Sequence, residues 1–246
     1  MASKVCTLSA AWPAPARVHA ITTLRQGGVS AGPYSSLNLA DHVGDCFDCV
    51  CRNREVLRQG LKLPREPTWL NQIHGVEVVN AAEVTSGVCA DGSYTSEPGV
   101  VCAILTADCL PLFMCDRSGD RVSLVHVGWR GLAGGIVERA VSVFVSSATP
   151  LAWMGPAIGP RAYEVGRDVY NEFAADDPEH RAAFTPSIRK DYWLADLYAL
   201  TRLRLQRSGV TQICGGEVCT YTEEEHFFSY RRDRRCGRMA SLIWIE

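Results

Sequence analysis

Three residues whose side chains can bind metals lie in short segments near glycine or proline: His74, Cys109 and His126. Neutral imidazole and thiolate suit zinc, and three protein ligands leave a fourth position open for water or substrate. The intervals from 74 to 109 and from 109 to 126 match no standard metal-binding motif. Each residue also has a structural explanation, His126 as a hydrogen-bonded core histidine and Cys109 as a small buried residue.

The same residues allow a second chemistry. Cys109 would be a nucleophile, with His126 as its base, and would act on an amide or peptide bond. A thiolate cannot be both a tight zinc ligand and a free nucleophile, so the metal content separates the two hypotheses. A third hypothesis is a metal-stabilised binding module without catalysis. The open ligand position and the surrounding arginines argue against it.

Polar residues that could contact a phosphate, a ribose or a base form a second candidate set: Arg25, Asn38, Arg130 and Arg231. The glycine-rich segment 128–135 opens a helix, so its backbone N–H groups could bind an anion, although a plain strand-to-helix turn has the same composition. In the basic cluster 231–238, Arg231 follows the aromatic segment 227–230 and is preferred for phosphate. Most of this cluster, Arg234 and Arg235 in particular, is expected on a solvated surface.

Other motifs carry less chemistry. Cys46, Cys49 and Cys51 form a C-x₂-C-x-C cluster, but no second ligand pair stands at the spacing of a zinc ribbon, so a loose surface cluster is favoured over a structural metal. The chain has no G-x-G-x-x-G and no Walker loop, which removes support for dinucleotide or nucleoside triphosphate binding. It also lacks the signature of the zinc nucleobase deaminases, so any deamination would use another scaffold.

Strands and helices must position these residues. Continuous apolar runs at 100–105 and 110–115 predict strands buried on both faces. Residues 121–145 predict a strand at 121–127, a glycine turn at 128–135 and a helix at 136–145. Further strands are expected at 18–23, 68–70, 76–79, 151–154, 218–221 and 240–245, and further helices at 48–60, 163–174 and 196–206. This mixture predicts an α/β or α+β fold in one domain over residues 1–246.

Composition narrows the class of protein. The chain has 246 residues, 47% of them hydrophobic, and 25 basic against 27 acidic residues, so it can bury a core and has no charge excess for nucleic acid or membranes. Eleven cysteines cannot all pair within the chain, and the first twenty residues contain no uninterrupted apolar stretch. We therefore expect a soluble cytoplasmic protein that binds neither nucleic acid nor membranes.

Three segments around the candidate ligands resemble a known family. Asn71-Gln-Ile-His-Gly75, Leu105-Thr-Ala-Asp-Cys-Leu-Pro111 and Val125-His-Val-Gly-Trp-Arg-Gly131 are similar to the signature segments of the multicopper polyphenol oxidase, or laccase-domain, family. Its members are also described as purine nucleoside phosphorylases and as a bacterial peptidoglycan editing factor. Shorter similarities occur at 23–28, 36–39, 42–45, 53–54, 155–159, 163–165, 219–221, 227–233 and 237–241. Together they span nearly the whole chain.

The resemblance implies one zinc ion bound by His74, Cys109 and His126, which match the family's ligands without substitution. It implies a layered α/β/β/α fold with mixed sheets, also likened to the cysteine-hydrolase-like fold of bacterial deamidating toxins. The implied activity is phosphorolysis of adenosine, inosine, guanosine and methylthioadenosine, with adenosine deamination beside it. The alternative is a hydrolase that removes misincorporated serine from peptidoglycan precursors. The expected partners are a purine nucleoside and phosphate, and the expected state is a monomer.

A copper-dependent polyphenol oxidase is the second alternative, and the histidines argue against it. Multicopper oxidation needs several copper ions held largely by paired histidines, but the six histidines here are isolated. Met114 could in principle complete a blue-copper site, yet its offset from Cys109 within a buried strand does not place its sulfur on the metal. Copper is therefore retained only as an alternative, adventitious metal beside zinc.

Overall fold

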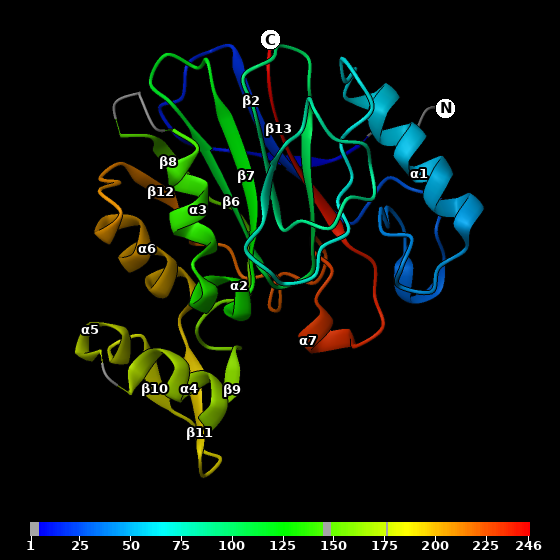
Figure 1. Cartoon of the computed structure of the whole chain (residues 1–246). Helices are drawn as coiled ribbons and strands as arrows, with labels where there is room; N and C mark the ends of the chain where they lie inside the picture. The colour runs from blue at the N-terminus through cyan, green and yellow to red at the C-terminus, as the bar shows by residue number, and fades with distance from the viewer. Residues whose placement is uncertain (1–4, 145–148, 176) are drawn as a thin grey trace.

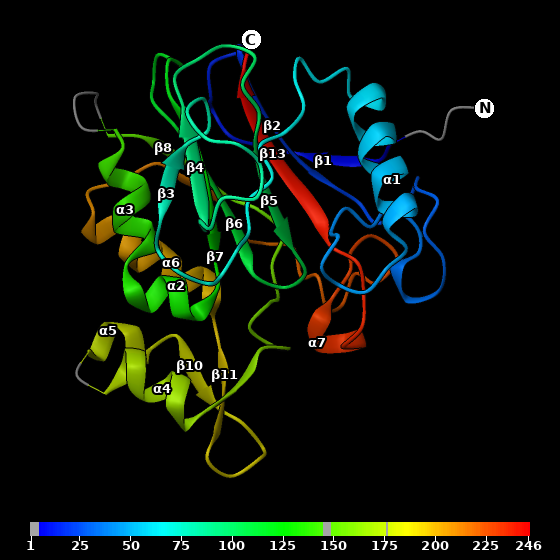
Figure 2. The same cartoon turned by 45° about the vertical axis from the view of Figure 1, so that its right-hand side comes forward.

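The computed structural model describes residues 5–144, 149–175 and 177–246, and two β-sheets packed face to face form its centre (Figures 1 and 2). The first sheet has the antiparallel order β1 (Thr7–Ser9), β2 (Val18–Thr23), β13 (Met239–Ile245) and β5 (Cys102–Thr106). The second has the order β12 (Ile213–Gly215), β8 (Leu151–Met154), β6 (Leu110–Cys115), β7 (Val122–Val127), β4 (Gly92–Thr95) and β3 (Val78–Asn80). Its terminal pairs, β12–β8 and β3–β4, are parallel, and the pairs between them are antiparallel.

Side chains on β6 show why the apolar runs lack an alternating pattern. Phe113 and Cys115 point into the core between the two sheets, whereas Leu112 and Met114 point into the core beneath the helices. Successive residues of a strand face opposite sides, and both sides are covered here. The continuous apolar run is therefore the expected pattern for this strand.

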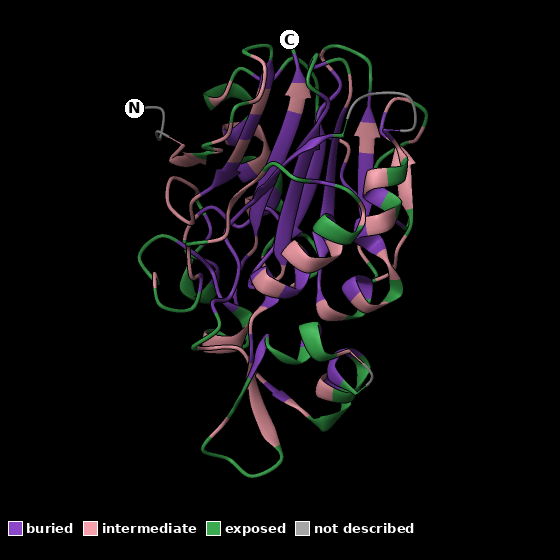
Figure 3. Cartoon of the chain, turned by 90° about the vertical axis from the view of Figure 1, so that its left-hand side faces the viewer, coloured by how far each residue is buried: buried purple, intermediate pink, exposed green. Residues whose placement is uncertain are grey.

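Helices cover the outer face of each sheet. The second sheet carries α2 (Trp129–Gly134), α3 (Ile136–Ser142) and α6 (Leu197–Arg207), which supply part of its outer core. The first sheet is covered by α1 (Phe47–Gly60), whose Leu57 packs with Ala103 and Leu242. Figure 3 shows the buried strands between helices with exposed outer faces. These layers confirm the predicted α/β/β/α arrangement.

A small unit projects beyond the end of the two sheets (Figure 1). It contains the antiparallel sheet β10 (Phe184–Pro186), β11 (Tyr192–Ala195) and β9 (Glu164–Gly166), together with α4 (Arg167–Ala174) and α5 (Pro178–Arg181). Two short elements lie outside these layers: a 3₁₀ turn at Gly32–Tyr34 and the helix α7 (Tyr230–Asp233). Among the described residues, no helix is long and apolar enough to cross a bilayer.

Two predicted strands do not form. Residues 68–70 make one isolated bridge, Thr68 to Cys102, because the Asn71 amide already turns away to donate to the Val88 carbonyl. Residues 218–221 likewise make one bridge, Cys219 to Ala157. The chain turns immediately after it, with the Glu223 amide donating to the Cys219 carbonyl. Both predictions were wrong because an apolar run promotes a strand only where a neighbour continues the ladder.

Two segments have a different secondary structure from the one predicted. Residues 163–174 begin as strand β9 rather than helix, because Val165 pairs with Trp193 of β11, and α4 starts only after Gly166. The expected glycine turn at 128–135 is largely the short helix α2, which ends where Gly135 takes a φ of 98°. The following helix ends at Ser142. Its predicted end at Val145 lies outside the described residues.

Candidate metal centre and its cavity

His74, Cys109 and His126 meet at one point although they come from different elements. Their ligand atoms all lie within 4.8 Å of one another, and the two imidazole rings are edge to face with centroids 4.7 Å apart. His126 lies on β7, Cys109 in the turn that leads from β5 to β6, and His74 in the loop before β3. This spacing suits one metal ion, whose bonds to nitrogen and sulfur are about 2.0–2.3 Å long.

The backbone around this group adopts conformations that few residues favour. His74 has a φ of 59° and Asp108 a φ of 92°, both in the left-handed region. Gly128 stands directly beside the ligands, since a Cβ there would lie 2.7 Å from His74 Nδ1 and 3.3 Å from Cys109 Sγ. The glycine-rich segment thus has a packing role, because its missing side chain leaves room for two of the three ligands.

Asp91 holds both histidines in place from inside the protein. Its Oδ1 accepts from His126 Nδ1 at 2.8 Å and from the His74 amide at 2.9 Å, and its Oδ2 accepts from the Gly75 amide at 2.6 Å. The carboxylate has no exposed surface. Because Nδ1 of His126 is engaged, its Nε2 is the nitrogen left for a metal or for Cys109. Asp91 could not be recognised from the sequence, since a single aspartate before a glycine forms no motif.

Charges around the ligands shift their pKa values in opposite directions. Burial lowers the pKa of His126, but the charge of Cys109 and the hydrogen bond to Asp91 outweigh burial and raise it to about 9. Burial, the neighbouring His126 and, to a smaller degree, Arg130 and Arg238 lower the pKa of His74. His126 thus holds a proton more tightly than a free imidazole does, and a metal bound to the same nitrogen would have to displace that proton. The residues present fit a zinc ion: two nitrogens and a sulfur, with one imidazole fixed by a buried carboxylate.

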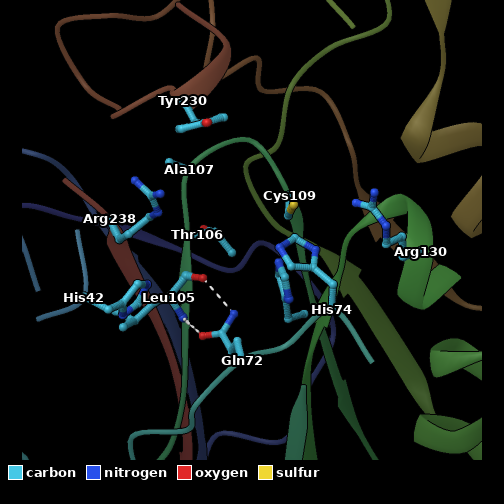
Figure 4. Close-up of a pocket in the computed structure, with 11 residues that line it drawn as sticks. His42, Gln72, His74, Leu105, Thr106, Ala107, Cys109, Arg130, Tyr230 and Arg238 are labelled. Atoms are coloured by element: carbon cyan, nitrogen blue, oxygen red, sulfur yellow. Dashed lines mark hydrogen bonds between the residues drawn. The ribbon is translucent and has the colours of Figure 1, made fainter. Parts of the chain in front are cut away.

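The ligand group opens into a cavity of about 470 Å³, a size typical of small-molecule sites. The cavity is lined by His42, Gln72, His74, Leu105, Thr106, Ala107, Cys109, His126, Arg130, Tyr230 and Arg238. In Figure 4, Arg130 lies on one side of His74 and Cys109, and Arg238 and Tyr230 lie on the other. The polar side chain of Gln72 is already paired, because it forms two hydrogen bonds with the Leu105 backbone, of 2.7 and 2.9 Å.

The structure brings one of the four expected substrate contacts, Arg130, to the cavity lining. The lining does not include the others. Arg25 donates to the carbonyls of Ser35 and Glu224, and Arg231 donates to the carbonyl of Glu164. Asn38 is fully buried, and its Oδ1 accepts from the Arg238 amide at 3.0 Å. Asn38 therefore positions an arginine of the cavity from behind.

Arg238 lines the cavity, although most of its arginine cluster was expected on a solvated surface and Arg238 was not singled out from the sequence. Its Nη1 donates to the carbonyls of Cys236 and Gly237 at 2.9 and 3.0 Å, and its guanidinium carbon lies 5.7 Å from the Tyr230 ring centre. These contacts hold the charged group over the cavity. Arg238 could not be distinguished within the arginine cluster, because the sequence does not indicate which of these side chains points into the cavity.

Comparisons with known proteins identify the family to which the chain belongs. A family model described as multi-copper polyphenol oxidoreductase laccase matches residues 19–246. A protein of Shigella flexneri named purine nucleoside phosphorylase YfiH is 51% identical over 236 residues, which cover 95% of this chain and 96% of that protein. A purine nucleoside phosphorylase of Haemophilus influenzae is 45% identical over 237 residues, covering 96% and 97%.

Solved structures resemble the fold over almost its full length. A crystal structure from Neisseria meningitidis has a TM-score of 0.92 and 49% identity, covering 98% of this chain and 99% of that chain. The crystal structure of YlmD from Geobacillus stearothermophilus has a TM-score of 0.86 and 33% identity, covering 94% and 93%. The likeness therefore includes the sheets, the helices and the projecting unit together.

Proposed function

The chain belongs to the family described as multi-copper polyphenol oxidoreductase laccase, and on this premise we propose that it is a purine nucleoside phosphorylase with a zinc centre at His74, Cys109 and His126. The observation that carries the proposal is the cavity itself. Metal ligands and two arginines line a single space, in a chain about half identical to proteins named purine nucleoside phosphorylases.

The cavity offers a separate surface to each part of the reactants. Phosphorolysis breaks the bond from ribose C1′ to purine N9 and forms a bond from C1′ to a phosphate oxygen. The guanidinium groups of Arg130 and Arg238 supply planar donors for an oxyanion. The half-exposed ring of Tyr230 supplies a flat face on which a purine can stack.

Holding phosphate and nucleoside in one cavity is the main contribution that these residues make. Positive charge develops on the sugar and negative charge on the leaving purine, so fixed charges that need no rearrangement lower the barrier. Zinc, when bound by the three ligands, supplies Lewis acidity to a substrate atom. Asp91 keeps His126 oriented, and Gly128 leaves the ligands room. The substrates proposed are adenosine, inosine, guanosine and methylthioadenosine, with adenosine deamination as a side activity.

Product analysis tests this proposal. Zinc-loaded protein is incubated with adenosine, with and without inorganic phosphate, and the products are separated by chromatography. Phosphate-dependent formation of adenine and ribose-1-phosphate is the expected result, with inosine as a minor product. Equal cleavage without phosphate would make the protein a nucleoside hydrolase, and no purine turnover would contradict the proposal.

A second candidate function rests on one contact. The Cys109 sulfur lies within 4.8 Å of a His126 ring nitrogen, and Asp91 is hydrogen-bonded to His126 Nδ1. Cysteine, histidine and aspartate in this order are the arrangement of a cysteine hydrolase. Such an enzyme could remove misincorporated serine from a peptidoglycan precursor. It would work without zinc and would be inactivated by thiol alkylation, whereas zinc bound to Cys109 would protect that sulfur.

A further inference from the structure

Two cysteines outside the cavity stand together at the beginning of α1. Cys46 is the N-cap residue and Cys49 lies in the first turn, where the Val50 amide makes its hydrogen bond back to the Cys46 carbonyl at 3.1 Å. Residues three apart on a helix lie on the same face. The Cys46 and Cys49 side chains are therefore neighbours at the start of the helix, and neither cysteine is in a disulfide.

The Cys46 side chain does not cap helix α1. N-cap residues usually accept a hydrogen bond from an amide of the first turn, but the Cys46 side chain makes none. Its own amide donates to Asp45 Oδ1 at 2.8 Å, so Asp45 fixes the chain entering the helix. Cys46 is exposed, and Cys49, three residues further along the helix, lies on the same face. A serine or aspartate would serve the helix better, and so the cysteine needs another explanation.

A metal site does not explain the pair. Structural zinc takes four ligands. Within the described part of the chain, the group of three or more metal-binding side chains that comes together is His74, Cys109 and His126. Cys51 is two residues beyond Cys49, and residues two apart on a helix do not face each other. The pair Cys46 and Cys49 therefore remains as a dithiol.

We propose that Cys46 and Cys49 form a redox site, closing a reversible disulfide by exchange with a low-molecular-weight disulfide. The Cys46 thiolate attacks one sulfur of the external disulfide and releases the other as a thiolate. The Cys49 thiolate then attacks Cys46, forming the Cys46–Cys49 bond and releasing the second thiol. The protein loses two electrons and two protons, and the external disulfide becomes two thiols.

The surroundings assign a role to each sulfur. Cys46 is exposed at the N-terminus of α1, so an external disulfide can reach its sulfur first. Cys49 is half-buried, and its pKa is raised by the hydrogen bond to Cys46, by burial and by the charges of Cys46, Asp45 and Asp48. Cys49 is therefore the later, resolving thiol. Phe47 between them is 69% exposed and gives an incoming disulfide apolar surface.

Mass spectrometry of the zinc-loaded full chain tests this proposal, with glutathione disulfide as the probe. After treatment, free thiols are alkylated and the peptides mapped without reduction. The expected result is a Cys46–Cys49 disulfide that dithiothreitol reverses. Cys51→Ser is the matched control on the same helix and should form the same disulfide. Cys46→Ser should form none, and Cys49→Ser should accumulate glutathione bound to Cys46.

Other outcomes overturn the proposal. Wild-type protein that ends with glutathione on Cys46 and no internal disulfide would show that Cys49 does not resolve it. A disulfide that includes Cys51 would show that the helix does not select the pair. Loss of one zinc equivalent in Cys46→Ser or Cys49→Ser, measured by elemental analysis, would make the pair a metal site. These readouts do not depend on nucleoside turnover.

Discussion

Asp91 Oδ1 lies 2.8 Å from His126 Nδ1 in the protein interior, and this contact decides which imidazole nitrogen faces Cys109. The same carboxylate accepts from the amides of Ile73, His74 and Gly75. Burial opposes the charged carboxylate, but the hydrogen bonds from His126 and Gly75 outweigh it and lower the pKa of Asp91. One side chain thus orients two candidate metal ligands that are far apart in sequence.

Replacing this carboxylate should weaken metal binding. Asp91→Asn keeps the size but loses the charge that orients His126, so we expect zinc affinity to fall about 10- to 100-fold. Competition with a chromogenic chelator measures the change. Asp116→Asn, at a buried aspartate beyond the other end of β6, is the control and should keep wild-type affinity. Equal affinity in Asp91→Asn would mean that backbone packing alone orients His126.

Adding a methyl group at Gly128 should displace the ligands. In Gly128→Ala the new Cβ would stand 2.7 Å from His74 Nδ1 and 3.3 Å from Cys109 Sγ, so we expect loss of bound zinc with the fold retained. Elemental analysis and circular dichroism check the two parts. Gly75→Ala is the matched control, since its Cβ meets nothing nearer than Asp91 Oδ2 at 3.4 Å. Full zinc content in Gly128→Ala would contradict the predicted crowding.

Removing the guanidinium of Arg238 should weaken phosphate binding. Losing a charge-assisted hydrogen bond costs about 1.5–3 kcal/mol, so Arg238→Ala should raise the phosphate KM roughly 10- to 100-fold with unchanged zinc content. Phosphate titrations of adenosine phosphorolysis measure this. Arg231→Ala is the comparison, because Arg231 bonds to the Glu164 carbonyl and does not line the cavity. A larger effect in Arg231→Ala would move the phosphate site toward that residue.

Acid should destabilise the projecting unit through Asp177. The hydrogen bond from Arg207 holds the pKa of Asp177 below its ordinary value of 3.8, and the carboxylate also caps α5. A lowered folded-state pKa contributes stability above the unfolded pKa, and this stability is lost as the pH falls below about 4. Asp177→Asn should therefore lower the melting temperature at neutral pH and flatten its acid dependence. Asp191→Asn, in an exposed pair with Arg167, should change neither.

The group His74, Cys109 and His126 could be singled out from the sequence because the metal-binding chemistry of these side chains is visible in residue type, and the structure brings their ligand atoms together. Asp91 could not, since its partners His74 and His126 come together only through the fold. Arg238 could not either, because its amide bonds to Asn38, 200 positions earlier, and that contact turns the side chain toward the cavity. Roles that depend on distant contacts leave no local pattern.

The fold shows the same difference between features visible in the local sequence and features that depend on distant contacts. Strands β5, β6 and β7 were predictable because both of their faces are buried, which leaves an uninterrupted apolar run. Strand β4 has the residues Gly92, Ser93, Tyr94 and Thr95, and its start reads as a turn. Gly92 is required there because a Cβ would lie 2.4 Å from Val125 Cγ1 on the neighbouring β7. Close packing against β7 thus requires a glycine at position 92, and this glycine makes strand β4 hard to predict from the sequence.

The position of β13 between β2 and β5 has a consequence for how the protein is made. At about 5–20 residues per second, the ribosome needs on the order of ten seconds after β5 before β13 emerges. Throughout that time β2 and β5 each expose an unpaired inner edge, which makes the nascent chain a target for chaperones and for aggregation. Arg238 arrives with the same strand. A chain whose synthesis stops before residue 238 therefore lacks both the closed first sheet and the arginine that lines the cavity.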